Sequence, residues 1–101
     1  MMKKGLRIVW DKNALKYLRS AIEFIRKDSP QNAEKVKKDI IASVIALTDN
    51  PERHPPDKYR TNNDGSFRAF ELYKFRIAYF VSNKEIRIIR IRHTRQEPKA
   101  F

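Results

Sequence analysis

The residues best suited to chemistry lie in the last third of the chain, from Phe67 to Phe101. This segment carries one histidine, His93, and six arginines: Arg68, Arg76, Arg87, Arg90, Arg92 and Arg95. A hydrophobic core does not need these cations, whereas an anionic partner does. The unperturbed pKa of a histidine lies near neutrality, so His93 is suited to proton transfer. We therefore expect a small sheet that carries clustered arginine on one face.

The overall charge points to the same class of partner. The chain has 23 basic and 12 acidic residues, a net charge of +11 and a pI near 10.2. This imbalance favours RNA, DNA or an acidic protein, bound in a salt-dependent manner. Two histidines and no cysteine argue against a metal site, and Gly5 and Gly65 cannot form a glycine-rich phosphate loop. We expect no metal and no cofactor.

Length and composition predict one folded domain over residues 1–101. Hydrophobic residues make up 41% of the chain, enough for one modest core. The sequence contains no signal-type segment and no apolar run of membrane length. The absence of cysteine fits a reducing compartment. We therefore expect a cytoplasmic protein without a membrane partner.

The first half of the chain predicts a strand followed by two helices. Leu6–Trp10 is short and rich in β-formers, and Asp11 after it is a suitable helix N-cap. Apolar residues at helical spacing predict one helix over Asn13–Lys27. Ser29 and Pro30 then predict a break and the start of a second helix, which should end near Thr48. The short connection implies an antiparallel helical hairpin.

The second half predicts a long loop and three strands. The loop spans residues 49–66, and the sequence fits either a mobile segment or an ordered lid. The strands are predicted over Phe67–Leu72, Phe75–Val81 and Ile86–Arg92. Regular alternation would place Ile86 and Ile88 of the last strand on the face of Arg90 and Arg92. The fold class is α+β, in which a terminal three-stranded antiparallel region and the first strand form one sheet in the order β-α-α-β-β-β.

Several of these segments together resemble one known family. They are the Ser29-Pro30 break, the proline-containing stretch Leu47–Pro51, and Phe67-Arg68, Phe75–Tyr79, Ile88–His93 and Arg95–Pro98. The chain resembles, over nearly its whole length, the RelE/ParE superfamily of type II toxin–antitoxin toxins, many of which are called plasmid-stabilisation proteins. The resemblance implies a growth-inhibiting toxin that is masked by a cognate acidic antitoxin.

The RelE-like branch implies a ribosome-dependent endoribonuclease that binds RNA and cleaves mRNA in the decoding site. By this resemblance Arg76 contacts the scissile phosphate, Arg95 shares that task, and His93 acts as general acid or base. The substrate-binding residues would be three further arginines: Arg68, Arg90 and Arg92.

The alternatives do not require nuclease chemistry. ParE-like members poison DNA gyrase, and an inactive relative would only bind an antitoxin. Phe101 falls where the RelE pattern carries a catalytic tyrosine, and phenylalanine cannot transfer a proton. Arg76 is equally suited to pair with a carboxylate such as Glu71. Arg92 and Arg95 would then dock an acidic antitoxin segment, and His93 would have a surface or packing role.

Overall fold

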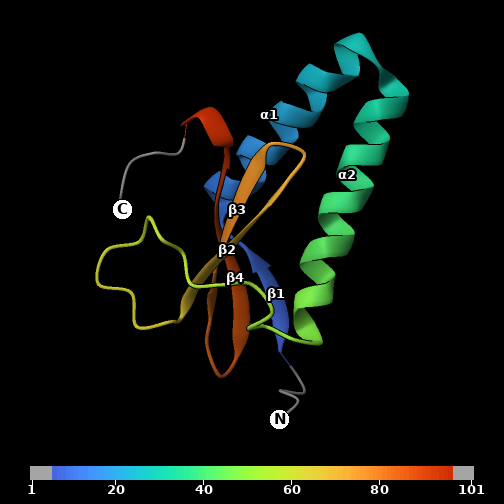
Figure 1. The fold of residues 1–101 in the computed structure, drawn as a ribbon. Helices are drawn as coiled ribbons and strands as arrows, with labels where there is room; N and C mark the ends of the chain where they lie inside the picture. Colours follow the sequence, from blue (N-terminus) through green and yellow to red (C-terminus); the bar gives the residue numbers. More distant parts are fainter. Residues whose placement is uncertain (1–5, 97–101) are drawn as a thin grey trace.

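The computed structural model describes residues 6–96. Its elements follow the predicted order of strand, two helices and three strands (Figure 1). They are β1 (Arg7–Trp10), α1 (Lys12–Asp28), α2 (Pro30–Ile45), the 3-10 turn η1 (Ala46–Thr48), β2 (Phe67–Leu72), β3 (Phe75–Val81), β4 (Glu85–His93) and the 3-10 turn η2 (Thr94–Gln96). The α+β fold class predicted from the sequence is confirmed.

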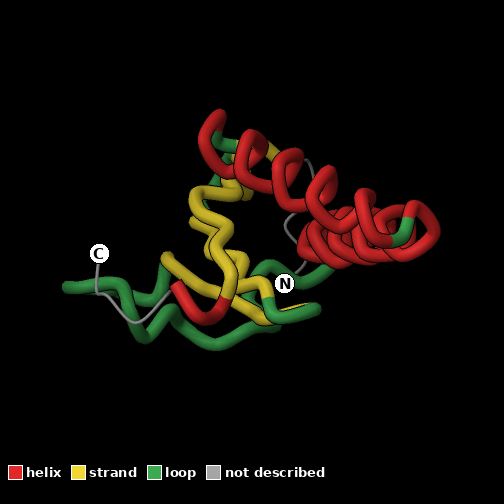
Figure 2. The backbone as a smooth tube through the Cα atoms, turned by 90° about the horizontal axis from the view of Figure 1, so that it is seen from above, coloured by secondary structure: helices red, strands yellow, loops and turns green. Residues whose placement is uncertain are grey.

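The four strands form one mixed sheet in the order β1-β4-β3-β2. Strand β1 pairs with β4 in parallel, and the other pairs are antiparallel. The helical hairpin lies on one side of this sheet, and much of the 49–66 loop lies on the other (Figure 2). We call the helix-covered side the inner face and the opposite side the outer face.

The helix boundaries have local causes that the sequence shows. The Asp11 carboxylate accepts a hydrogen bond from the Asn13 N–H at 2.9 Å. The Ser29 hydroxyl accepts one from the Asn32 N–H at 3.1 Å, and Pro30 starts α2. Each cap satisfies a backbone donor that has no partner inside the helix. Both predicted caps are confirmed.

The core lies between the helical hairpin and the inner face. One side of α2 and η1 is buried against the sheet, through Ala33, Val36, Ile40, Val44 and Leu47. The inner face contributes residues from the two central strands: Phe75, Ile77, Tyr79, Val81, Ile86, Ile88 and Ile91. The apolar spacing in the sequence also includes Phe24 and Ile45, which are exposed. It therefore predicted the helical half of the core only in part.

Strand β4 departs from the predicted alternation. The pairing with β3 shifts between Ala78 and Tyr79, which face Arg90 and Ile88 respectively, so that Ile89 forms a β-bulge. The extra residue reverses the alternation after Ile88. Ile91 therefore joins the core, and Arg90 lies on the outer face. The prediction that Ile86 and Ile88 share a face with Arg90 and Arg92 was wrong, because guanidinium groups in the core would be desolvated without partners.

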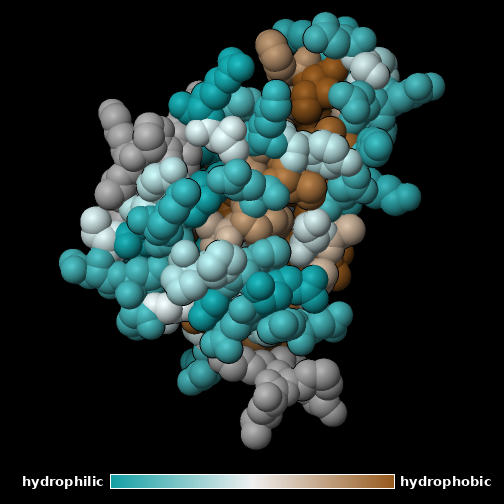
Figure 3. Space-filling view, in the orientation of Figure 1, coloured by the Kyte–Doolittle hydropathy of each residue, from teal (hydrophilic) through white to brown (hydrophobic). Residues whose placement is uncertain are grey.

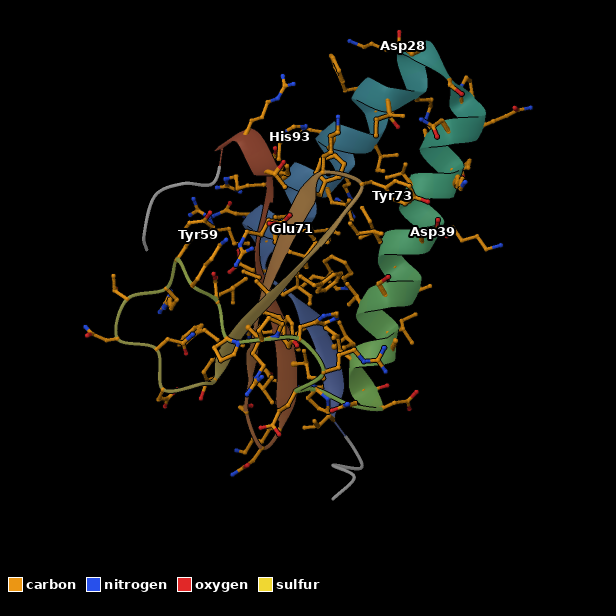
Figure 4. All side chains as sticks on the ribbon, viewed as in Figure 1. Asp28, Asp39, Tyr59, Glu71, Tyr73 and His93 are labelled. Atoms are coloured by element: carbon orange, nitrogen blue, oxygen red, sulfur yellow. The ribbon has the colours of Figure 1, made fainter. Side chains whose placement is uncertain are left out.

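The β2–β3 connection is a two-residue turn at Tyr73 and Lys74. Their φ angles are 53° and 66°, as in the type I′ turns that match the twist of a hairpin. Neither residue is a typical choice at positive φ. The Tyr73 hydroxyl donates to the Asp39 carboxylate on α2, and this bond raises the pKa of Tyr73. Figure 4 shows this contact between the hairpin and α2.

The 49–66 loop is ordered against β2. The Asp57 N–H donates to the Phe67 carbonyl at 2.8 Å, and the Ala69 N–H donates to the Pro55 carbonyl at 3.3 Å. The Asn63 amide donates to the Asp57 and Phe67 carbonyls at 3.2 and 2.7 Å. These bonds satisfy backbone groups that a loop packed on a sheet would otherwise bury unpaired.

Tyr79 connects the core to the start of this loop. Its side chain is fully buried, and its hydroxyl donates to the Pro51 carbonyl at 2.8 Å. The ring of His54 stacks on Phe70 at 4.4 Å and meets the Tyr79 ring edge-on. His54 therefore packs against the core, and its burial, followed by the charge of Arg53, lowers its pKa.

The burial of Tyr79 predicts resistance to ionisation at high pH. Burial raises its pKa from 10.0 to about 12. Because the folded-state pKa is the higher one, the stabilisation is complete below pH ~10 and is lost as the pH rises through ~12. In an absorbance titration, one of the four tyrosines should ionise last. Tyr79→Phe should remove that step.

The same substitution tests the hydrogen bond to Pro51. Tyr79→Phe leaves a buried carbonyl without its donor, so the free energy of unfolding should fall by about 1–2 kcal/mol. Urea denaturation followed by Trp10 fluorescence would measure the change. The exposed Tyr73→Phe is the matched control. An unchanged last titration step in Tyr79→Phe would contradict the assignment.

Candidate functional site

The sheet separates the predicted site residues into two groups. Strand pairing places Arg76 opposite both Glu71 and Arg92, and Ala78 opposite Arg90, all on the outer face. Arg68 pairs with Tyr79, and His93 pairs with Phe75. Directly paired residues share a face, so Arg68 and His93 belong to the inner face. The expectation that the arginines cluster on one face therefore fails for Arg68.

Arg76 is held by two carboxylates. Its Nη2 lies 2.8 Å from Asp57 Oδ1, and its Nη1 lies 3.1 Å from Glu71 Oε2. The guanidinium also lies over the Tyr59 ring, 4.8 Å from its centroid. Figure 4 shows Tyr59 and Glu71 on this side of the sheet. The alternative that Arg76 pairs with Glu71 is confirmed, and Asp57 is the closer partner.

This ion pair is deeply buried. Arg76 is 8% exposed and Asp57 is 2% exposed. The pair makes a single contact at 2.8 Å, and both Asp57 Oδ2 and Arg76 Nε are buried without a hydrogen-bond partner in residues 6–96. A charge buried in this way is stable only while its counter-charge is present. Asp57 was not singled out from the sequence, because no local pattern connects it to Arg76.

Arg68 has a positioning role for the loop. Its Nη1 donates to the His54 carbonyl at 2.7 Å and approaches the Glu52 carbonyl at 3.4 Å. Both acceptors belong to the 49–66 loop. The predicted substrate-binding arginine therefore binds the protein's own backbone in this structure.

His93 lies at the end of β4, beside α1. Its main-chain N–H donates to the Tyr17 hydroxyl at 2.9 Å. Its Nδ1 accepts a hydrogen bond from the Arg95 N–H at 3.2 Å, and its ring meets Phe75 edge-on at 5.9 Å. An Nδ1 that accepts a bond leaves Nε2 to carry the proton of the neutral ring. Arg95 itself is exposed, in η2.

A largely apolar hollow of about 460 Å³ adjoins His93. Its lining includes Tyr17, Phe24, Tyr73 and Lys74. Figure 3 shows apolar side chains at the surface between the β2–β3 hairpin and the helices. Arg76 does not line this hollow, so His93 and Arg76 have different surroundings on different faces.

The outer face of β4 carries a row of arginines. Its members are Arg87, Arg90 and Arg92, opposite Phe80, Ala78 and Arg76 of β3. Arg87 pairs with Glu85 at 2.9 Å. Arg92 donates to the Ile91 carbonyl at 2.7 Å and lies 5.1 Å from the centroid of the Tyr17 ring.

The described residues therefore do not assemble the predicted catalytic set. Arg76 is enclosed, His93 lies on the other face, and Phe101, which would replace a catalytic tyrosine, lies outside the described residues. Within residues 6–96, no group of three histidine or acidic side chains is placed to hold a metal ion. No helix in this part of the chain is long and apolar enough to cross a membrane.

Comparison with solved structures finds a protein of the same fold. A solved structure described as the chromosomal ParDE toxin–antitoxin system from P. aeruginosa matches with a TM-score of 0.67 and 23% sequence identity. The match covers 88% of this chain and 96% of that chain, and at this identity it establishes a shared fold. No curated protein sequence matches the chain.

The family comparison covers nearly the whole chain. The matching model is that of the ParE toxin of the type II toxin–antitoxin system parDE, over residues 8–98. The resemblance to the RelE/ParE superfamily is thereby confirmed, and it implies an antitoxin partner. The chain belongs to the ParE toxin family of type II toxin–antitoxin systems.

Proposed function

We propose that this toxin inhibits growth in the cytoplasm by binding DNA gyrase, without nuclease activity of its own, and that an acidic cognate antitoxin masks it. The resemblance assigns gyrase poisoning to the ParE-like branch, and the family model that matches is a ParE model. The observation that carries the proposal is the enclosure of Arg76 by Asp57 and Glu71.

Energetics disfavour a catalytic role for Arg76. To contact a scissile phosphate, its guanidinium must leave Asp57. A hydrogen bond between charged groups contributes about 1.5–3 kcal/mol. An uncompensated buried charge costs about 3–5 kcal/mol, and Asp57 is 2% exposed. The exchange is therefore unfavourable unless residues 55–60 also leave the sheet.

The position of His93 disfavours concerted acid–base chemistry. A general acid or base must come within hydrogen-bond distance of the proton that it transfers. His93 lies on the inner face, packed on Phe75, whereas Arg76 lies on the outer face. A single phosphodiester cannot meet both groups in this arrangement. Ribosome-dependent mRNA cleavage by Arg76, His93 and Arg95 is the alternative that the experiments below test.

The first test separates the two targets. Induction of the toxin alone should give gyrase-dependent DNA breaks and intact mRNA, read by plasmid topology and primer extension from one culture. His93→Ala should leave growth inhibition within about twofold of the wild type, because the proposed function gives His93 no proton to transfer. If His93 were a general acid or base, its loss would reduce activity about 10²–10⁴-fold. Cleavage at codons within translated mRNA, lost in His93→Ala, would overturn the proposal.

The second test asks whether Arg76 is structural. Arg76→Ala leaves Asp57 buried and unpaired, so the free energy of unfolding should fall by about 3–5 kcal/mol in urea denaturation. Glu71→Gln is the matched control. Its side chain is 52% exposed, so the change should stay below about 1 kcal/mol.

A further variant distinguishes structure from chemistry. Arg76→Met combined with Asp57→Asn removes both charges and should recover part of the lost stability. If the double variant regains its fold and still inhibits gyrase, Arg76 has no chemical role. An Arg76→Ala protein of unchanged stability that cannot inhibit growth would contradict the structural role.

A further inference from the structure

We propose that the outer face of β4 binds the phosphate backbone of duplex DNA through Arg87, Arg90 and Arg92. The biological relevance of this DNA binding rests on the proposed function, because gyrase acts on duplex DNA. A toxin that contacts both the enzyme and its DNA would bind preferentially where the two are together. The observations that carry it are independent of gyrase.

The first observation is the placement of the three arginines. The bulge at Ile89 brings Arg90 and Arg92 to the face of Arg87. Each arginine occupies the next outer-face position in the register with β3, so their Cα atoms follow one another at about 7 Å. Bulges often redirect side chains next to functional sites. Without the bulge, Arg87 would lie on the opposite face from Arg90 and Arg92. With it, all three arginines lie on the outer face.

The second observation is the choice of cation. The strands contain arginine and no lysine, whereas most of the lysine and arginine residues in the helices are lysine. A lysine would serve solubility equally well. Arginine offers a planar fork of donors that matches phosphate oxygens, and it is the usual choice for nucleic-acid recognition. The sheet therefore carries the cation suited to phosphate, and the helices carry the one suited to solvation.

The third observation favours the duplex backbone over single-stranded bases. Proteins bind unpaired bases by stacking them on free aromatic rings. The aromatic rings that residues 6–96 place on the outer face already have partners. Arg60 lies 3.8 Å from the centroid of Phe67, and Phe67 packs on Phe80 at 4.8 Å. Arg76 lies over Tyr59. This face offers charge rather than stacking surfaces.

A carboxylate at the end of the row provides a sensitive test. Glu85 Oε2 lies 2.9 Å from both Nε and Nη2 of Arg87. Phosphate must compete with this carboxylate for the guanidinium. Removal of the Glu85 charge should therefore strengthen DNA binding. Glu34 pairs with Arg26 on the helices at 3.0 Å, so Glu34→Gln changes the net charge equally at a different surface.

The experiment measures binding of a fluorescent DNA duplex of mixed sequence by anisotropy at several salt concentrations. Arg90→Gln with Arg92→Gln should weaken binding roughly tenfold at low salt and reduce the salt slope by about 2. Lys16→Gln with Lys35→Gln is the control, because it removes two exposed helical charges. Glu85→Gln should tighten binding, and Glu34→Gln should not.

Several outcomes would overturn the inference. Equal losses in the arginine and lysine variants would show that only the net charge matters. Equal or tighter binding of an RNA duplex, or displacement of the DNA by an acidic peptide at equal charge concentration, would assign the face to another partner. Melting curves for each variant exclude a loss of fold as the cause.

The inference and the proposed function can fail separately. If arginine-dependent DNA binding is found but purified gyrase is unaffected, the gyrase proposal fails and the DNA surface stands. If gyrase is inhibited and the arginine variant inhibits it equally in the presence of DNA, the DNA surface fails and the proposed function stands.

Discussion

The buried ion pair between Arg76 and Asp57 is the interaction on which the outer half of the structure depends. It joins the central strand β3 to the 49–66 loop across nineteen residues of sequence. Neither charge has enough solvent contact to be stable alone. The loop must therefore stay on the sheet for the Asp57 carboxylate to neutralise the buried Arg76 guanidinium. The closed state of this face follows from electrostatics, and the backbone bonds of Asp57 and Asn63 add to it.

The second constraint is that one nine-residue strand, β4, must pack a core and carry charges. Its sequence places two isoleucines together at Ile88-Ile89 and so breaks the alternation. In a regular strand with Ile86 and Ile88 in the core, Arg90 would point into the core and Ile91 would point to the outer face. The bulge resolves this conflict at the cost of one unpaired residue.

Local signals predicted much of the fold and little of the site. The Asp11 and Ser29 caps, the helical stripe and the three late strands follow from contacts within a few residues, which sequence patterns record. The pairing of Arg76 with Asp57 depends on how a long loop folds back, which no periodicity encodes. The outer-face row depends on a bulge whose position is fixed by β3. The arginines could be identified from the sequence, but which of them share a face follows only from the strand register in the structure.

The same ion pair also makes the arginine row possible. Arg76 and Arg92 occupy directly opposite positions on β3 and β4, where like charges destabilise a sheet. Asp57 and Glu71 supply two negative charges to Arg76, so the repulsion on Arg92 is offset from the β3 side. The Arg92 guanidinium packs on the Tyr17 ring beside this compensated site. Under the proposed function, the arginine that the RelE-like branch would use for catalysis supports the surface formed by its neighbours on β4.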